Sequence, residues 1–177
     1  MVSVILISLW KALGEIGSSL FKEASLWWLL TPLFLFWIIL EVYFGAYKEE
    51  KLGWNTALGN GITLVWVAVE SLRFLFYNSS KVSVLRFIVL ISILVYGGFI
   101  VFMAFSHQFS EKVTFLLASP SPIYFLALIT ILWGHNVLRL TWWVLADLIL
   151  LYLIFLGLMS LVRIMLPEMR KGIEMQF

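Results

Sequence analysis

Three acidic side chains interrupt long apolar stretches of this 177-residue sequence, and they are the first residues to consider for chemistry. Glu41 lies in FWIILEVYF, Glu70 in WVAVESLRF and Asp147 in WWVLADLILL. Ionisable groups in a hydrocarbon environment are costly, and they commonly line ion pathways or proton relays. The three acids are therefore the first candidates for a transport path.

Basic side chains in comparable positions offer a simpler interpretation. Glu70 and Arg73 are three residues apart, so on a helix they can neutralise each other. Arg139 and Arg163 lie near the ends of apolar stretches, where a long side chain can reach the lipid headgroups. His135 follows a glycine in WGHN, which is typical of a turn. Structural pairing is the favoured interpretation for these groups.

Asp147 is the exception among the acids. It lies deepest in its apolar stretch, aspartate is too short to reach the membrane surface, and no basic residue lies within one helical turn. Glu41, by contrast, has a longer side chain that can reach its interface or a base on a neighbouring helix. A functional role and a hydrogen-bonded packing role are equally compatible with the position of Asp147.

Several other chemistries lack their residues in this sequence. It contains no cysteine and two histidines, so thiolate catalysis, iron–sulfur clusters and cysteine-type zinc sites are excluded. HExxH, GxSxG and phosphate-binding glycine-loop motifs do not occur. We therefore predict no cofactor and no metal site, and the sequence does not favour an enzyme.

The composition defines the class of protein. Hydrophobic residues make up 63% of the chain and charged residues 12%, and the mean hydropathy is +1.04. A soluble domain carries about 25% charged residues. Twelve basic and ten acidic side chains are too few to cover a soluble surface, and they exclude a disordered chain or a basic nucleic-acid binder. The sequence predicts an all-α integral membrane protein whose partner is the lipid bilayer.

The apolar stretches divide this single domain, residues 1–177, into elements. Residues 1–24 have apolar side chains at helical spacing but also four charges, which predicts an amphipathic helix lying in the membrane interface. Apolar stretches of about 20 residues suffice to cross the ~30 Å hydrocarbon core. The expected spans are about 25–47, 56–77 (with Asn55 as the N-cap), 84–105 and 138–166, and residues 167–177 form a charged tail.

Residues 113–134 admit two interpretations. They are apolar, but Pro120 and Pro122 interrupt them, and Ser121 followed by Pro122 is a favourable helix start. The segment is either a kinked fourth span, which gives five spans in all, or a re-entrant hairpin, which leaves four. With five spans the lysines and arginines divide six against six; with four they divide eight against four and place both termini in the cytoplasm.

The number of spans also decides whether the ionisable groups meet. If the last span begins at residue 138, then Arg139, Trp143 and Asp147 share one face. In the five-span arrangement Arg139 enters from the side on which Glu70 and Arg73 lie, and Asp147 sits ~12 Å further in. That arrangement predicts a polar cluster of these four ionisable residues. In the four-span arrangement the cluster comes apart.

The leading functional hypothesis is an oligomeric channel or transporter unit for a cation or protons. Asp147, with Glu70 or Glu41, would line the path. One alternative is a non-catalytic accessory or scaffold subunit of a larger membrane complex. A third is a lipid-modifying enzyme that uses Asp147, His135 and Glu70. We expect a multi-pass protein of the plasma (cell) membrane that forms a homo-oligomer or binds other membrane subunits.

Overall fold

The computed structural model describes residues 2–47, 53–78 and 83–166, and every regular element in these ranges is a helix. The predicted tail at 167–177 and the middle of the first polar loop lie outside the described residues. The elements are α1 (Val2–Ser19), the 3-10 helix η1 (Ala24–Leu26), α2 (Trp27–Ala46), α3 (Trp54–Asn78), α4 (Val84–Ser106), α5 (Glu111–Leu117), α6 (Pro120–Gly134) and α7 (Trp142–Met165).

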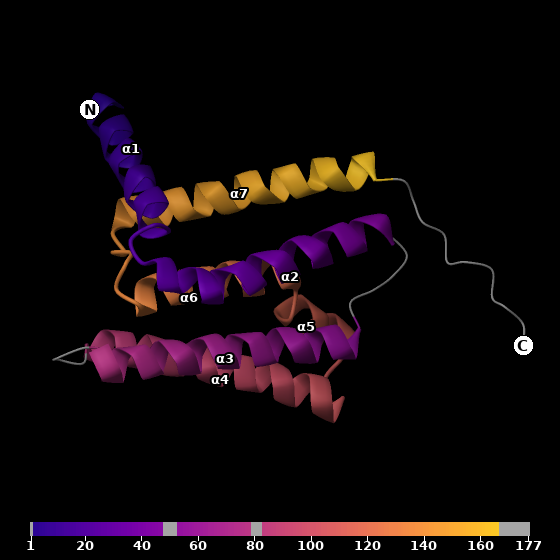
Figure 1. The fold of residues 1–177 in the computed structure, drawn as a ribbon. Coiled ribbons are helices and arrows are strands. Elements are labelled where there is room, and N and C mark those ends of the chain that lie inside the picture. Colours follow the sequence, from indigo (N-terminus) through magenta and orange to yellow (C-terminus); the bar gives the residue numbers. More distant parts are fainter. Residues whose placement is uncertain (1, 48–52, 79–82, 167–177) are drawn as a thin grey trace, which may run out of the picture.

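Five helical segments are long and apolar enough to cross a membrane, which confirms a multi-pass membrane protein. They run along a common axis in alternating directions (Figure 1). The segment α5–α6 begins at the end where α4 stops and finishes at the opposite end, where α7 begins (Figure 1). The four-span arrangement is therefore wrong. The five spans are Ala24–Ala46, Trp54–Tyr77, Val84–Ser106, Glu111–Gly134 and Trp142–Met165.

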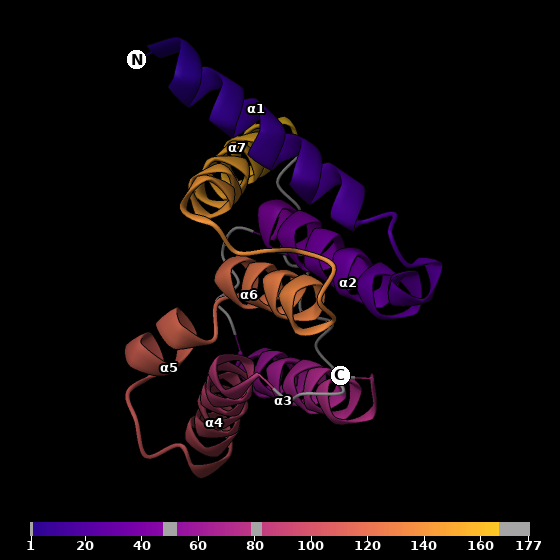
Figure 2. The same ribbon diagram turned by 90° about the vertical axis from the view of Figure 1, so that its left-hand side faces the viewer.

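The helix α6 lies at the centre of the bundle. It packs against α2 on one side and α3 on the other, and α4 packs mainly on α3 (Figure 2). Because α6 separates α2 from α3, these two helices have little direct contact. The helix α7 packs mainly on α1 and α2, and its Tyr152 also contacts Phe125 of α6. It is the least covered span: 17% of its apolar window is buried, against 33–44% for the others.

The break between α5 and α6 occurs at Ala118–Ser119. Ser119 is the N-cap with extended backbone, and α6 begins at Pro120, one half-turn before the predicted start at Pro122. The first backbone N–H groups of a helix have no partner within the helix, so prolines in the first turn sacrifice no hydrogen bond. Proline has no backbone N–H, so the two prolines allow the span to break without adding an unpaired N–H group at either position.

The start of the last span was predicted wrongly. The helix α7 begins at Trp142, and the Thr141 side chain caps it by accepting a hydrogen bond from the Val144 N–H at 3.3 Å. Val137 and Leu138 are buried in the preceding loop, where both backbone N–H groups donate to Leu132 O. A buried apolar loop has the same sequence pattern as the start of a span. Arg139 therefore lies outside α7 and shares no helical face with Asp147.

The helix α1 crosses the end of the bundle where α2 and α7 begin (Figure 2). It buries Ala12 and Ile16 and leaves Lys11 exposed. Residues 2–19 thus form a helix outside the five spans, and its position in the membrane interface stays a prediction. A second correction concerns α3, which starts at Trp54 and contains Asn55 inside the helix instead of using it as the N-cap.

One glycine sets the distance between α3 and α4. A Cβ built at Gly97 would lie 2.9 Å from the Val65 backbone N and 3.0 Å from Gly61 O, so the two backbones approach as closely as only glycine permits. This contact belongs to the most extensive helix pair of the bundle. The pair α3–α4 is thus a rigid support for α6.

Candidate functional site

Two buried carboxyl groups lie on α2 and α7, two helices that pack against each other. Glu41 is on α2 and Asp147 on α7, and each is 3% exposed. The Trp37–Phe155 ring contact fixes the relative position of the two helices. Glu41 stands one turn beyond Trp37 and Asp147 eight residues before Phe155, which puts the acids about 18 Å apart along the helices. We use the name α2–α7 seam for the part of these two helices that extends from Glu41 to Asp147.

At one end of the seam Glu41 has two partners from other helices. The Ser121 hydroxyl of α6 donates to one carboxylate oxygen, and the Arg163 guanidinium of α7 donates to the other and forms an ion pair. The Arg163 side chain is 45% exposed, so the pair joins the buried acid to the surroundings of the bundle. A cavity of about 290 Å³ adjoins it and is lined by Glu41, Phe44, Phe115, Ser119, Pro120, Ser121 and Arg163.

Two local features bring these partners together. The break before α6 puts Ser121 in the first turn of a helix, where the helix dipole favours a nearby negative charge. Gly45, one turn after Glu41, lets α7 approach, because a Cβ there would lie 2.8 Å from Arg163 Cγ. A larger residue at Gly45 would push Arg163 away from Glu41.

Aromatic rings fill the middle of the seam. Trp37 lies 4.1 Å from Phe155, and Phe125 stacks on Tyr152 at 4.6 Å between ring centroids. The indole N–H of Trp37 is buried and has no hydrogen-bond partner in the described part of the chain. Tyr152 adds a phenol hydroxyl to this part of α7. Polar atoms therefore continue inward from Glu41 to the middle of the membrane.

The other end of the seam is apolar. Asp147 makes no hydrogen bond or ion pair with the described residues, and its Oδ2 is fully buried. It faces a cavity of about 230 Å³ between α1 and α7, which α1 covers. Except for Asp147 the lining is apolar: Leu6, Leu9, Trp10, Leu13, Leu150, Leu151 and Ile154.

The predicted four-residue polar cluster does not form among the described residues. Glu70 and Arg73 pair with each other, with N–O distances of 2.8 and 2.5 Å. The backbone N–H of Arg139 donates to Glu15 on α1 at 3.3 Å, and Asp147 lies in the α1–α7 cavity. The cluster fails because it depended on a last span beginning at residue 138.

His135 lies at the end of α6, outside the spans, and is buried. Its ring packs on Phe74 at 4.4 Å, and Nδ1 lies 2.9 Å from Ile131 O. Burial lowers the pKa of His135 below its ordinary value, while the charges of Glu70 and Glu23 oppose this shift. The geometry is that of a packed loop residue.

Charged side chains also hold the loop that follows His135. Lys22 Nζ donates to Val137 O at 2.7 Å, and Arg86 donates to Asn136 Oδ1 at 2.5 Å. Asn136 has a positive φ of 61°, a conformation that asparagine tolerates better than most residues. These contacts stabilise the end of the bundle under α1.

Helical spacing puts Glu41 on one face of α2 with Trp37 and Gly45, and both lie at the contact with α7. The sequence also predicts that Glu41 can reach a base on a neighbouring helix, and Arg163 is such a base. It did not identify Ser121 or Arg163 in particular as the partners, because they are 80 and 122 residues away along the chain. Within the described ranges, no group of three or more His, Asp or Glu side chains could hold a metal ion. No histidine there hydrogen-bonds a serine or threonine hydroxyl.

Comparisons with known proteins add no assignment: no family model, curated protein or solved structure matches this chain.

Proposed function

We propose that the protein is a proton-translocating unit of the cell membrane and that protons move along the α2–α7 seam between Glu41 and Asp147. The observation that carries the proposal is the pair of buried carboxyl groups on two helices that pack against each other, Glu41 on α2 and Asp147 on α7. Buried acids in membrane spans are costly, and proton relays are a principal use of such groups.

The donor set favours a proton over a metal cation. A bound Na⁺, Mg²⁺ or Ca²⁺ needs several oxygen ligands around one point. Glu41 and Asp147 are about 18 Å apart, and each stands as a single carboxyl group. A proton needs only one carboxyl oxygen at a time, so each acid is sufficient by itself.

Arg163 is proposed to control proton binding at Glu41. While Arg163 is paired with Glu41, the guanidinium occupies the carboxylate and competes with a proton. The helix α7 carries both Arg163 and Asp147 and has the smallest covered fraction of the five spans. A displacement of α7 along α2 would separate Arg163 from Glu41 and open the aromatic contact of Trp37 with Phe155.

Access differs between the ends of the seam in this conformation. The Glu41 end adjoins a cavity with charged and hydroxyl groups, which can hold water. The Asp147 end is covered by the apolar face of α1. Translocation therefore requires α1 to move away from α7, and we propose that this movement alternates with the separation of Arg163 from Glu41.

A second candidate is an accessory subunit of a larger membrane complex. The uncovered face of α7 favours it, since Ile149, Leu153 and Ile164 are exposed apolar residues that a second copy or another subunit could cover. On this hypothesis the Glu41–Arg163 pair only attaches α7 to α2.

Proton flux into liposomes tests the two proposals. Purified protein is reconstituted with an internal pH dye, and a potassium gradient with valinomycin drives proton entry. We expect the wild type to acidify the interior faster than protein-free liposomes, and Glu41→Gln to abolish this difference. Glu70→Gln is the matched control, because Glu70 pairs locally with Arg73 outside the seam, and it should retain the wild-type rate.

Wild-type liposomes that acidify no faster than empty ones would contradict proton transport and favour the accessory subunit. An unchanged rate in Glu41→Gln would remove Glu41 from the path. Size-exclusion chromatography with light scattering on the same material then shows whether the protein is a homo-oligomer.

A further inference from the structure

A polar stripe on α3 plays no part in the seam. Asn55, Thr56, Gly59, Asn60 and Thr63 recur at intervals of about four residues, which places them on one face of the helix. Their helix is also the least apolar of the five spans, with a mean hydropathy of 1.2 in its best window. This spacing is visible in the sequence, but none of these residues is ionisable.

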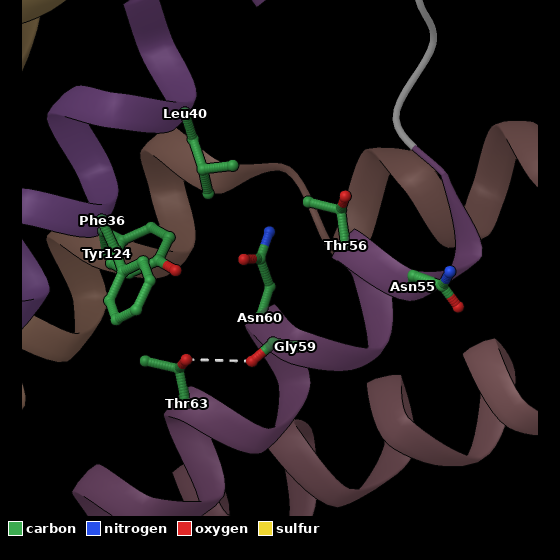
Figure 3. A pocket seen from close by; sticks show the side chains of 8 residues that line it. All are labelled: Phe36, Leu40, Asn55, Thr56, Gly59, Asn60, Thr63 and Tyr124. Atoms are coloured by element: carbon green, nitrogen blue, oxygen red, sulfur yellow. Dashed lines mark hydrogen bonds between the residues drawn. The ribbon is translucent and has the colours of Figure 1, made fainter. Parts of the chain in front are cut away.

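The stripe forms one wall of a groove between α2 and α3. Because α6 separates these helices, a cavity of about 380 Å³ remains between them, with Tyr124 of α6 at its base. Figure 3 shows the Asn60 amide facing into this space from the α3 wall, opposite Leu40 and Phe36 of α2. This volume lies within the range of small-molecule sites.

The groove opens toward the hydrocarbon of the bilayer. Phe36 on its α2 side is 58% exposed, and Ile62 on the neighbouring face of α3 is 52% exposed. Both are apolar, as expected of residues that contact lipid chains. A molecule embedded in the membrane can thus reach the groove from the side.

A second cavity adjoins the groove at the end of the span where α3 begins. It measures about 480 Å³, shares Asn55 and Thr56 with the groove, and is bordered by Trp54 and His107. Trp54 is the first residue of α3, and Thr63 lies nine residues further, roughly 13 Å along the helix. The polar wall therefore reaches from this end of the span nearly to its middle.

Internal hydrogen bonds use only part of the capacity of this wall. Asn60 Nδ2 donates to Ala118 O at 2.7 Å, and the Thr63 hydroxyl donates to Gly59 O at 2.9 Å. Each amide and hydroxyl can form further hydrogen bonds. Polar groups that face hydrocarbon without partners are strongly unfavourable, so an occupant that offers hydrogen bonds to this wall is favoured over a lipid chain.

The chemistry of the lining selects the occupant. The residues around the 380 Å³ cavity carry no charge, so an anionic phosphate or a cationic amine would be buried without a counter-charge. A hydroxyl group both donates and accepts hydrogen bonds, and the Asn60 amide and the Thr63 hydroxyl can do the same. The aromatic rings of Phe36 and Tyr124 can pack against the C–H groups of a sugar ring. We propose that the groove binds the headgroup of a neutral, hydroxyl-rich membrane lipid, such as a glycosyl diacylglycerol.

Native mass spectrometry of the full chain with defined lipids tests this site. The probes are dioleoyl glucosylglycerol and dioleoyl phosphatidylcholine, which have the same acyl chains. We expect the glucosyl lipid to be retained preferentially by the wild type and about tenfold less by the double variant Thr56→Val and Thr63→Val, which removes two hydroxyls without changing shape. Thr31→Val, an exposed threonine on α2 outside the groove, should bind as the wild type does.

Three results would overturn the proposal. One is equal retention of the two lipids. Another is undiminished glucosyl-lipid binding by the double variant. The third is displacement of the lipid by soluble methyl glucoside at equal concentration, because the site would then recognise a free sugar. Asn60→Leu is avoided as a test because Asn60 also holds the α5–α6 break through Ala118.

Discussion

Glu41 and Asp147 are equally buried, and yet their surroundings have almost nothing in common. Glu41 is held by a hydroxyl from α6 and a guanidinium from α7, next to a cavity with polar walls. Asp147 has no partner in the described chain and faces the apolar side of α1. The seam is thus polar and connected at one end and apolar and covered at the other.

This difference shows why burial alone is a poor guide to the role of an acid. A buried acid with partners contributes to the attachment of helices, whereas one without partners costs free energy and persists for another reason. Variants that change the partners of Glu41, the charge of Asp147 or the cover provided by α1 test this difference between the two ends of the seam.

The largest effect is expected from Arg163→Leu, which leaves Glu41 buried without its counter-charge. Removing one partner of a buried pair costs about 3–5 kcal/mol, and the partial exposure of Arg163 places this case near the lower limit. Unfolding in bicelles should show the loss. The double variant Glu41→Leu with Arg163→Leu should recover most of it, and Arg73→Leu should change little. A stable Arg163→Leu single variant would contradict the ion pair.

Asp147→Leu is expected to have the opposite sign. It removes a buried carboxyl group that lacks a partner, and an unsatisfied buried polar group costs about 1–3 kcal/mol. The free energy of unfolding should therefore rise by an amount in this range, whereas Glu41→Leu should lower it. If Asp147→Leu destabilises the protein, Asp147 has a binding partner, and the contrast between the two ends would be lost.

Removal of residues 2–19 tests the cover on the Asp147 end. Without α1 the first turns of α7 are exposed at the membrane interface, so their backbone amides should exchange hydrogen faster. Amides of α2 around Glu41 should keep the wild-type exchange rate, because α1 does not contact that end. Mass spectrometry of peptides from both helices measures the two rates in one sample, and equal acceleration at both ends would contradict a local cover.

The smallest effect concerns His135, which lies near the α1 end of the bundle. Because burial lowers its pKa below the ordinary value of 6.5, the folded chain binds fewer protons than the unfolded chain between the two values. Stability should be highest above pH 6.5 and fall as the pH drops through this window. His135→Gln should reduce this decline by a modest amount, about 1.4 kcal/mol for each unit of pKa difference. A decline that is the same in His135→Gln would assign it to other groups.

The sequence predicted those features that depend on local composition. The apolar stretches predicted the spans, the charges of Lys11, Glu15 and Lys22 separated the first helix from these spans, and the i,i+3 spacing predicted the Glu70–Arg73 pair. Contacts between distant segments could not be found this way. Arg163 reaches Glu41 only because Gly45 allows α7 to approach, and no local pattern reveals such an approach.

One wrong prediction and one alternative that the sequence left open have the same physical origin. The loop at Val137–Leu138 is as apolar as a span because it is buried under α1, and the segment with Pro120 and Pro122 resembles a hairpin because proline usually ends a helix. In both places the residue types agree with two backbone conformations, because apolar residues occur in buried loops as well as in spans, and proline occurs in the first turn of a helix as well as after its end. Only the hydrogen bonds of Leu132 O and the position of α5 distinguish the alternatives.

The thin covering of α7 has a consequence for the membrane itself. Its 24 residues extend about 36 Å, which exceeds a hydrocarbon core of ~30 Å, so the helix must tilt or the bilayer must thicken around it. The other spans are constrained by one another, whereas the inclination of α7 is set largely by lipid. A thinner bilayer increases that inclination and shifts the Arg163 end relative to α2. Bilayer thickness therefore enters directly into the strength of the contact between Arg163 and Glu41.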